Sequence, residues 1–296
     1  MKNNKLFGIL IILLIGFCLN ISAQHPLLQY FNGAKENIIQ YPEALYPVFD
    51  RIREGNKIVR IVQIGDSHVR GHVFPMAIRT ELEKGWGDKA VFHDPVNYNT
   101  TAIAHETGLS GVVFSAIGRN GATCATFTHA DNMKEVARLH PDLIIISFGT
   151  NESHGRNYQA AEHHRQIGAL TAMLQQYCPT SVLLFTTPPG SFISQRRTRN
   201  RRRKRNRYIK ISNPHTVLAS ATITEFASGI KMPVWDLYSI AGGKEEACRN
   251  WKKLRFYRRD GVHFTEDGYT LQGRLLADAI LKSYTEYITS NETKKE

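Results

Sequence analysis

Two short segments hold side chains that together could carry out nucleophilic catalysis. Ser67 stands in Gly-Asp-Ser-His directly after an apolar run, and His263 follows Asp260 by three residues in Asp-Gly-Val-His. A serine at the end of a buried strand can expose its hydroxyl, and an aspartate near a histidine can orient the imidazole as a general base. This pattern favours attack on an acyl group with Ser67 as the nucleophile.

Two further turns could donate hydrogen bonds to the oxyanion that such an attack creates. Gly121 lies in Asn-Gly-Ala-Thr, where the missing Cβ lets a backbone N–H approach a ligand closely. Asn151 lies in Gly-Thr-Asn-Glu, and its side-chain amide could also donate. Each segment alone is equally compatible with an ordinary turn or helix cap, so their value depends on the elements that place them.

Strands and helices alternate along the chain. The predicted strands cover residues 58–64, 112–117, 142–148, 181–187 and 234–237, and the predicted helices cover 42–54, 73–84, 133–140, 158–177, 215–228 and 266–288. The strands are apolar without alternation, which is typical of a parallel sheet buried on both faces. A hydrophobic content of 42% with 22% charged residues excludes a disordered chain. We therefore expect an α/β fold with the site at the carboxyl ends of the strands.

The order of these segments resembles the four-block pattern of the SGNH (GDSL) hydrolase superfamily. The blocks read GDS, NGxT, GTNE and DGVHFTEDGY, and the resemblance covers about residues 58–288. It implies a flavodoxin-like three-layer α/β/α sandwich with a parallel five-stranded sheet of order 2-1-3-4-5, and a serine esterase that uses no cofactor and no metal. The implied catalytic residues are Ser67, Asp260 and His263, and the implied oxyanion donors are the Ser67 N–H, the Gly121 N–H and the Asn151 side chain.

The first block has histidine where many relatives have leucine. This Gly-Asp-Ser-His form resembles bacterial envelope esterases that remove O-acetyl groups from peptidoglycan, and it weakens an assignment to the GDSL lipases and thioesterases. The implied substrate is an acetylated carbohydrate polymer of the cell envelope, with His68 a candidate for the substrate rim. Acyl transfer to a sugar hydroxyl and hydrolysis of acyl-chain esters would use the same triad. A non-catalytic envelope protein that binds polyanions is the alternative from another class.

The amino terminus is typical of a secretory signal peptide. Lys2 and Lys5 precede an apolar run at residues 6–19, and small residues follow before Gln24. The run is shorter than the roughly 20 residues that span a bilayer, and no later segment is long and apolar enough. We expect a periplasmic or secreted protein. The expected organisation is a signal peptide at 1–23, a lead-in segment at 24–56, a hydrolase domain at 57–290 and a tail at 291–296.

The formal net charge of +12 is concentrated in one segment. Residues 196–207, predicted as a loop inserted after the fourth strand, hold nine basic residues and no acidic one. Such a run is compatible with a solvated surface loop or with a clamp for an anionic polymer. Nucleic acid is disfavoured because a secretory signal is present and no binding module is recognisable. The candidate contact residues are Arg196, Arg197, Arg199 and Arg201.

The four cysteines do not indicate a disulfide scaffold or a metal site. Cys18 belongs to the predicted signal peptide, and no Cys-x-x-Cys pair is present. Cys124, Cys178 and Cys248 would allow at most one disulfide within the mature chain, and the sequence leaves their pairing open.

Overall fold

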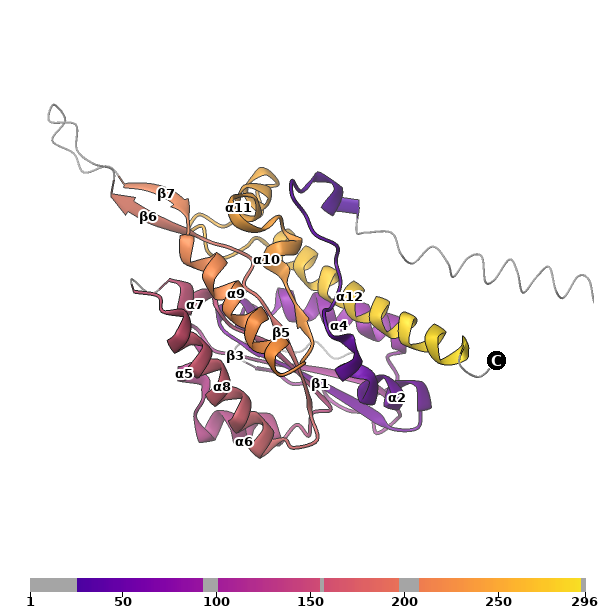
Figure 1. Cartoon of the computed structure of the whole chain (residues 1–296). Helices are drawn as coiled ribbons and strands as arrows, with labels where there is room; N and C mark the ends of the chain where they lie inside the picture. The colour runs from indigo at the N-terminus through magenta and orange to yellow at the C-terminus, as the bar shows by residue number, and fades with distance from the viewer. Residues whose placement is uncertain (1–25, 93–100, 155–156, 197–207, 294–296) are drawn as a thin grey trace, which may run out of the picture.

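A parallel sheet forms the centre of the computed structural model, which describes residues 26–92, 101–154, 157–196 and 208–293 (Figure 1). Its parallel strands are β1 (Ile58–Gly65), β3 (Gly111–Gly118), β4 (Leu143–Ser147), β5 (Val182–Thr186) and β8 (Val234–Trp235). They lie in the order β3-β1-β4-β5-β8. Numbered along the chain, this is the order 2-1-3-4-5, so the predicted fold class and strand order are confirmed.

Helices cover both faces of this sheet, because its strands are apolar on both sides. One face is covered by α2 (Tyr46–Glu54), α4 (Val73–Trp86) and α12 (Glu266–Thr293), and the other by α6 (Ala130–Ala137), α8 (Ala160–Tyr177) and α9 (Pro214–Gly229) (Figure 1). Neighbouring residues of β4 divide between the two cores. Ile145 joins the core with Leu276 of α12, and Ile146 joins the core with Leu170 of α8. The result is the expected three-layer sandwich.

Three short helices stand at the carboxyl ends of the central strands. They are α3 (Ser67–Arg70) after β1, α5 (Cys124–Phe127) after β3 and α7 (Thr150–Ser153) after β4. In a parallel sheet these ends share one edge, so the three helices bring their first residues close together.

The segment before β1 packs against the core. It contains η1 (Pro26–Tyr30) and η2 (Pro42–Leu45), which leads directly into α2. Leu28 and Phe49 are fully buried, and Gln40 forms an antiparallel bridge with Val234 of β8. The predicted signal peptide lies outside the described residues. No helix within the described ranges has the length and apolar character needed to cross a membrane.

Three features were not predicted. Strand β2 (Thr101–Ala102) adds an antiparallel edge beside β3, and α10 (Leu237–Ile240) and α11 (Gly243–Lys253) follow β8. Strands β6 (Phe192–Arg196) and β7 (Tyr208–Ser212) form an antiparallel hairpin after β5. Residues 197–207, most of the predicted basic loop, lie between these two strands and outside the described residues. Cys124, Cys178 and Cys248 are all free and buried.

Candidate active site

Ser67 is placed at the sheet edge by a tight turn after β1. A Cβ on Gly65 would lie 2.6 Å from the Ser147 carbonyl oxygen, so only glycine fits where the strand turns into α3. Asp66 caps α3 by accepting a hydrogen bond from the His68 N–H at 2.9 Å. Ser67 is therefore the first residue of the helix, with its side chain half-buried.

The structure brings Ser67, His263 and Asp260 into one hydrogen-bonded chain. Ser67 Oγ lies 2.9 Å from His263 Nε2, and His263 Nδ1 lies 2.8 Å from Asp260 Oδ2. Asp260 Oδ1 also accepts the N–H groups of Val262 and His263 at 2.8 and 2.9 Å. With Nδ1–H donating to the carboxylate, the neutral ring presents Nε2 as an acceptor for the serine proton.

Hydrogen bonds keep Asp260 ionised. Burial by itself would raise the pKa of this carboxyl, but the N–H groups of Val262 and His263 and the imidazole together lower it to about 2. The carboxylate is therefore charged at neutral pH and can stabilise a protonated His263.

The Asn151 side chain meets both neighbouring loops. Its Nδ2 donates to the Ala122 carbonyl oxygen at 2.9 Å and to Asp66 Oδ2 at 3.3 Å. Gly121, next to Ala122, is exposed and has φ +69°, a conformation that favours glycine. The predicted oxyanion donors thus stand at the ends of β1, β3 and β4. The longer bond, to Asp66, is the weaker of the two that the amide makes.

Asp66 is a buried acid directly behind Ser67. Burial raises its pKa to about 8, and the nearby charge of Glu152 adds to this, although the bond from the His68 N–H acts in the opposite direction. Asp66 is therefore mainly protonated at neutral pH. Its carboxyl group joins the serine turn to Asn151 without adding a full charge to the site.

His68, predicted as a candidate for the substrate rim, is buried. The side chain lies under the loop that carries His263, with 6% of the residue exposed, and its Nδ1 is 2.9 Å from the Tyr269 hydroxyl. Burial lowers its pKa to about 3, and the positive charge of His263 contributes.

His154 is a residue of this region that the sequence analysis missed. It ends α7, its Nε2 lies 2.8 Å from Ser191 Oγ, and its pKa is lowered by burial and then by the charge of His263. The only signal in the sequence that could have identified His154 is its position three residues after Asn151. Asp236, the acidic residue directly after β8, has a structural role: it caps α10 through the Ser239 N–H and accepts the Thr187 hydroxyl at 2.7 Å.

The β6–β7 hairpin begins beside the loop that carries Asp260 and His263. The Phe192 N–H donates to the Gly261 carbonyl oxygen at 2.8 Å, and Lys210 Nζ donates to the Arg259 carbonyl oxygen. Arg196 is exposed at the end of β6. The other predicted contact residues, Arg197, Arg199 and Arg201, lie outside the described residues.

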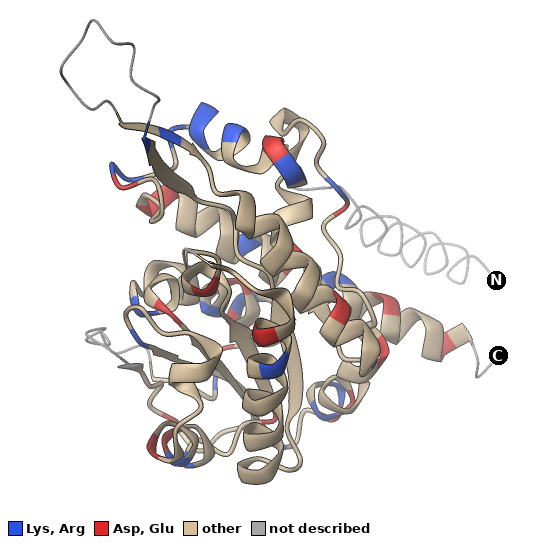
Figure 2. Ribbon diagram, turned by 60° about the vertical axis from the view of Figure 1, so that its left-hand side comes forward, with Lys and Arg blue, Asp and Glu red and all other residues tan. Residues whose placement is uncertain are grey.

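Basic side chains extend from this hairpin onto α11. Figure 2 shows Lys and Arg gathered on these two elements, and Lys252 Nζ lies 5.6 Å from the centre of the Phe192 ring. We call the surface formed by Lys210, Lys252, Arg258 and Arg259 the basic face; all four residues are exposed. It adjoins the hydrogen-bonded chain of Ser67, His263 and Asp260.

The arrangement suits acyl transfer. A serine hydroxyl faces an imidazole acceptor, a carboxylate orients that ring, and the Asn151 amide donates to Asp66, the residue before the serine. None of these steps uses a metal ion. Among the described residues, one group that could hold such an ion is Cys124 of α5, Glu152 of α7 and His163 of α8.

Comparisons with known proteins agree with this chemistry. Residues 64–271 match the model of the GDSL-like Lipase/Acylhydrolase family. A search of curated proteins finds no match. Among solved structures, one described as "Peptidoglycan O-acetylesterase in action" is similar with a TM-score of 0.64 and 19% sequence identity, over 87% of this chain and 98% of the other.

Two further structures are similar at lower TM-scores. A GDSL-like lipase from Bacteroides thetaiotaomicron has a TM-score of 0.47 and 17% identity, covering 82% of this chain and 100% of the other. A carbohydrate esterase family 3 structure from Talaromyces cellulolyticus has a TM-score of 0.49 and 13% identity, covering 77% of this chain and 99% of the other.

Proposed function

Because the chain belongs to the GDSL-like lipase/acylhydrolase family and is an ester-hydrolysing enzyme, we propose that Ser67 is its nucleophile, His263 its general base and Asp260 the residue that orients His263. The observation that carries this proposal is the continuous chain from Ser67 Oγ to His263 Nε2 at 2.9 Å and from His263 Nδ1 to Asp260 Oδ2 at 2.8 Å.

The reaction proceeds in two halves. His263 Nε2 takes the Ser67 proton as Oγ attacks the ester carbonyl carbon, and the resulting oxyanion accepts hydrogen bonds from the Ser67 N–H, the Gly121 N–H and the Asn151 amide. The imidazolium then protonates the departing alcohol, which leaves an acyl-serine. Water attacks this ester with His263 again as the base, and the carboxylic acid and free serine are released. In the structure, the longer hydrogen bond of the Asn151 amide goes to Asp66. During the reaction this N–H donates to the oxyanion instead.

The substrate we propose is an O-acetyl group on a carbohydrate of the cell envelope, such as peptidoglycan. The side chains of His263 and Asp260 are 35% and 48% exposed, so the reacting groups are open to an ester borne on a polymer. The structure described as a peptidoglycan O-acetylesterase supports this assignment through its similar fold. The predicted signal peptide supports a periplasmic or secreted location, where such a polymer is found.

The exposure of His263 and Asp260 also helps to separate the proposed hydrolysis from the alternative functions. Transfer of the acetyl group to a sugar hydroxyl would use the same acyl-serine, but exposure of His263 and Asp260 gives water access to it. Hydrolysis of long acyl chains would need an apolar channel at Ser67, whereas the side chain that contacts Ser67 Oγ is the polar His263. A polyanion-binding protein without activity would have no need for the hydrogen-bonded chain.

Acetate release tests the proposal. The mature protein is incubated with O-acetylated peptidoglycan, with acetylated xylan and with a small chromogenic acetate, each beside Ser67→Ala; Ser194→Ala, on the exposed hairpin, is the matched control. We expect release from peptidoglycan that Ser67→Ala abolishes and Ser194→Ala preserves. Release from xylan alone would replace the proposed substrate with a plant-type polysaccharide. No hydrolysis of any of the three by the parent protein would overturn the proposed function.

A further inference from the structure

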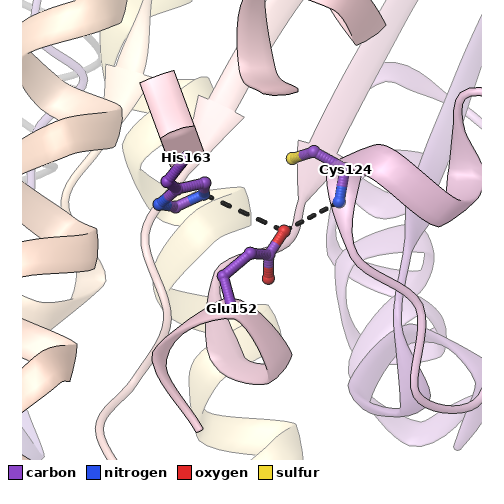
Figure 3. Close-up of side chains that lie close together, drawn as sticks. All are labelled: Cys124, Glu152 and His163. Carbon is purple, nitrogen blue, oxygen red and sulfur yellow. Dashed lines mark hydrogen bonds and ion pairs between the residues drawn. The ribbon is translucent and has the colours of Figure 1, made fainter. Parts of the chain in front are cut away.

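A cluster of three potential metal ligands lies behind the candidate active site. Cys124 is the first residue of α5, Glu152 belongs to α7 and His163 lies in the first turns of α8, and all three point toward a common centre (Figure 3). One ligand atom from each lies within 4.8 Å of the others. Cys124 and His163 are each 2% exposed, and the Glu152 side chain is 4% exposed. The cluster is thus closed to bulk water.

A chain of hydrogen bonds fixes the tautomer of His163. The Thr222 hydroxyl donates its single proton to the Leu218 carbonyl oxygen at 2.9 Å, so it can only accept from the Tyr158 hydroxyl, also at 2.9 Å. Tyr158 has then used its own proton and must accept from His163 Nδ1 at 2.9 Å. His163 therefore carries its proton on Nδ1. Deep burial favours the neutral ring, which leaves Nε2 with a lone pair.

This lone pair faces a carboxylate. His163 Nε2 lies 3.9 Å from Glu152 Oε1 and has no hydrogen-bond partner among the residues that the structure describes. Glu152 is itself held in place, because Oε1 accepts the Cys124 N–H at 2.7 Å and Oε2 accepts the Gly149 N–H at 2.9 Å. Two buried acceptors that face each other are unfavourable unless a proton or a cation lies between them. The Cys124 sulfur borders the same space (Figure 3).

We propose that Cys124, Glu152 and His163 bind a zinc ion. An imidazole nitrogen, a sulfur and a carboxylate oxygen are the ligand types that zinc takes in proteins. The bond from Nδ1 to Tyr158 is the outer contact that orients a histidine ligand toward its metal. Binding replaces the Cys124 S–H bond by a sulfur–zinc bond and releases the proton to solvent. The sequence analysis expected no metal, because these ligands come from three separate segments.

The ion would be structural, since it joins α5, α7 and α8 and contacts none of the residues proposed to react. Helix α5 follows the turn that holds Gly121, and α7 itself contains Asn151. Zinc at this point would tie together the two loops whose donors face the substrate, while the proposed hydrolysis needs no step at the metal.

Metal retention tests this proposal directly. The full chain is stripped with a chelator, supplied with Zn²⁺ and dialysed, and the bound zinc is measured by elemental analysis. Cys124→Ser and His163→Gln are compared with the matched controls Cys178→Ser and His164→Gln, which replace a buried cysteine far from the cluster and the adjacent exposed histidine. We expect one zinc per parent and control chain, and at least about 10-fold weaker binding in the two cluster variants.

Cobalt provides a readout that needs no variant. Co²⁺ bound to the parent protein should give a thiolate-to-cobalt charge-transfer band in the near ultraviolet. If the parent retains no stoichiometric zinc, or if cobalt binds without that band, the Cys124 thiol simply donates its proton to Glu152 or His163 and the proposal is overturned. Equal zinc retention in Cys124→Ser and the parent would also overturn it.

Discussion

At the scale of single residues, the candidate site depends on which group holds each proton. Asp260 is kept ionised by N–H donors, whereas Asp66 is kept protonated by burial. The two acids therefore act differently although both lie close to Ser67. Asp260 can balance the charge of His263, and Asp66 joins the serine turn to Asn151 without competing for that charge.

Asn151 provides the first test at this scale. Replacing Asn151 with alanine removes one proposed oxyanion donor and leaves Ser67 and His263 in place. We expect kcat on a small acetate ester to fall by roughly 10²–10³ with little change in KM, because the lost interaction forms mainly in the transition state. Asn132→Ala, which removes an amide bonded to the Phe127 carbonyl oxygen, is the control. A change in KM alone would contradict the assigned role.

The raised pKa of Asp66 predicts that the free energy of unfolding depends on pH. The folded chain keeps the Asp66 proton up to about pH 8, whereas the unfolded chain loses it near the ordinary value of 3.8. Unfolding in this range releases a proton, so the contribution of Asp66 is fully present below pH 3.8 and is lost as the pH rises toward 8. Urea unfolding at several pH values should show the free energy of unfolding decreasing across this window. The decrease should be smaller in Asp66→Asn and unchanged in Asp131→Asn, whose side chain is exposed.

At the scale of elements, close packing holds α3, α4 and α12 around the serine turn. A Cβ on Gly273 of α12 would lie 2.5 Å from the Ala77 Cβ and 2.7 Å from the Phe74 carbonyl oxygen, both in α4. A Cβ on Gly118, at the end of β3, would lie 2.1 Å from the Arg70 nitrogen of α3. These glycines let the elements approach closely enough to fix Ser67 relative to the final helix.

Two glycines in helices should respond oppositely to the same substitution. Gly273→Ala should destabilise the protein by about 1–3 kcal/mol, because the added methyl group has no room against α4. Gly168→Ala, in α8, should stabilise it by about 0.5–1 kcal/mol, since its Cβ would make an ordinary 3.6 Å contact with Phe226 and alanine favours the helix. Chemical denaturation measures both values. A destabilised Gly168→Ala beside an unaffected Gly273→Ala would contradict this packing.

The elements that the sequence predicted are those with a strong local signal. Strands β1, β3, β4 and β5 are mainly apolar runs buried on both faces, so their composition identifies them. The strand predicted at 234–237 is shorter, because β8 ends at Trp235 and Asp236 caps α10. Strands β6 and β7 are exposed or half-buried and flank a highly basic segment, which gives no such signal. The helix predicted at 133–140 lies at Ala130–Ala137, because His140 has φ +46° and Pro141 follows it.

Candidate site residues could be predicted from the sequence where they belong to a recognisable motif. Ser67, Asn151 and His263 belong to short blocks of recognisable order, and the structure brings them to one edge of the sheet. His154 and the cluster of Cys124 with His163 belong to no motif, since their nearness results from how the helices pack. The buried position of His68 also depends on packing, here against Tyr269 of the final helix.

At the scale of the whole molecule, the positive charge is unevenly distributed. The formal net charge is +12, and nine of the basic residues lie within residues 196–207. The hairpin that leads to this segment contacts the loop carrying His263, and the basic face lies at the same place. An anionic polymer attracted to these residues would therefore be brought toward Ser67.

Kinetics on two substrates test this role of the charge. Replacing the arginines of residues 196–207 with serine should raise KM on an anionic acetylated polymer, because fewer cations attract it, and should leave a small acetate ester unaffected. The same comparison at increasing salt should reduce the difference between the parent and the variant, since ions screen the attraction. Lys134→Ser, on the exposed surface of α6, is the control. An equal loss on both substrates would instead indicate damage to the fold.

The central claim is that Ser67 forms the covalent intermediate. The most direct test treats the full chain with an organophosphonate that reacts with activated serines, maps the adduct by mass spectrometry and follows acetate-ester hydrolysis in parallel. We predict a single adduct on Ser67 whose formation matches the loss of activity, and no adduct in His263→Ala, which lacks the base. An adduct on another residue, or full activity in protein modified at Ser67, would contradict the account.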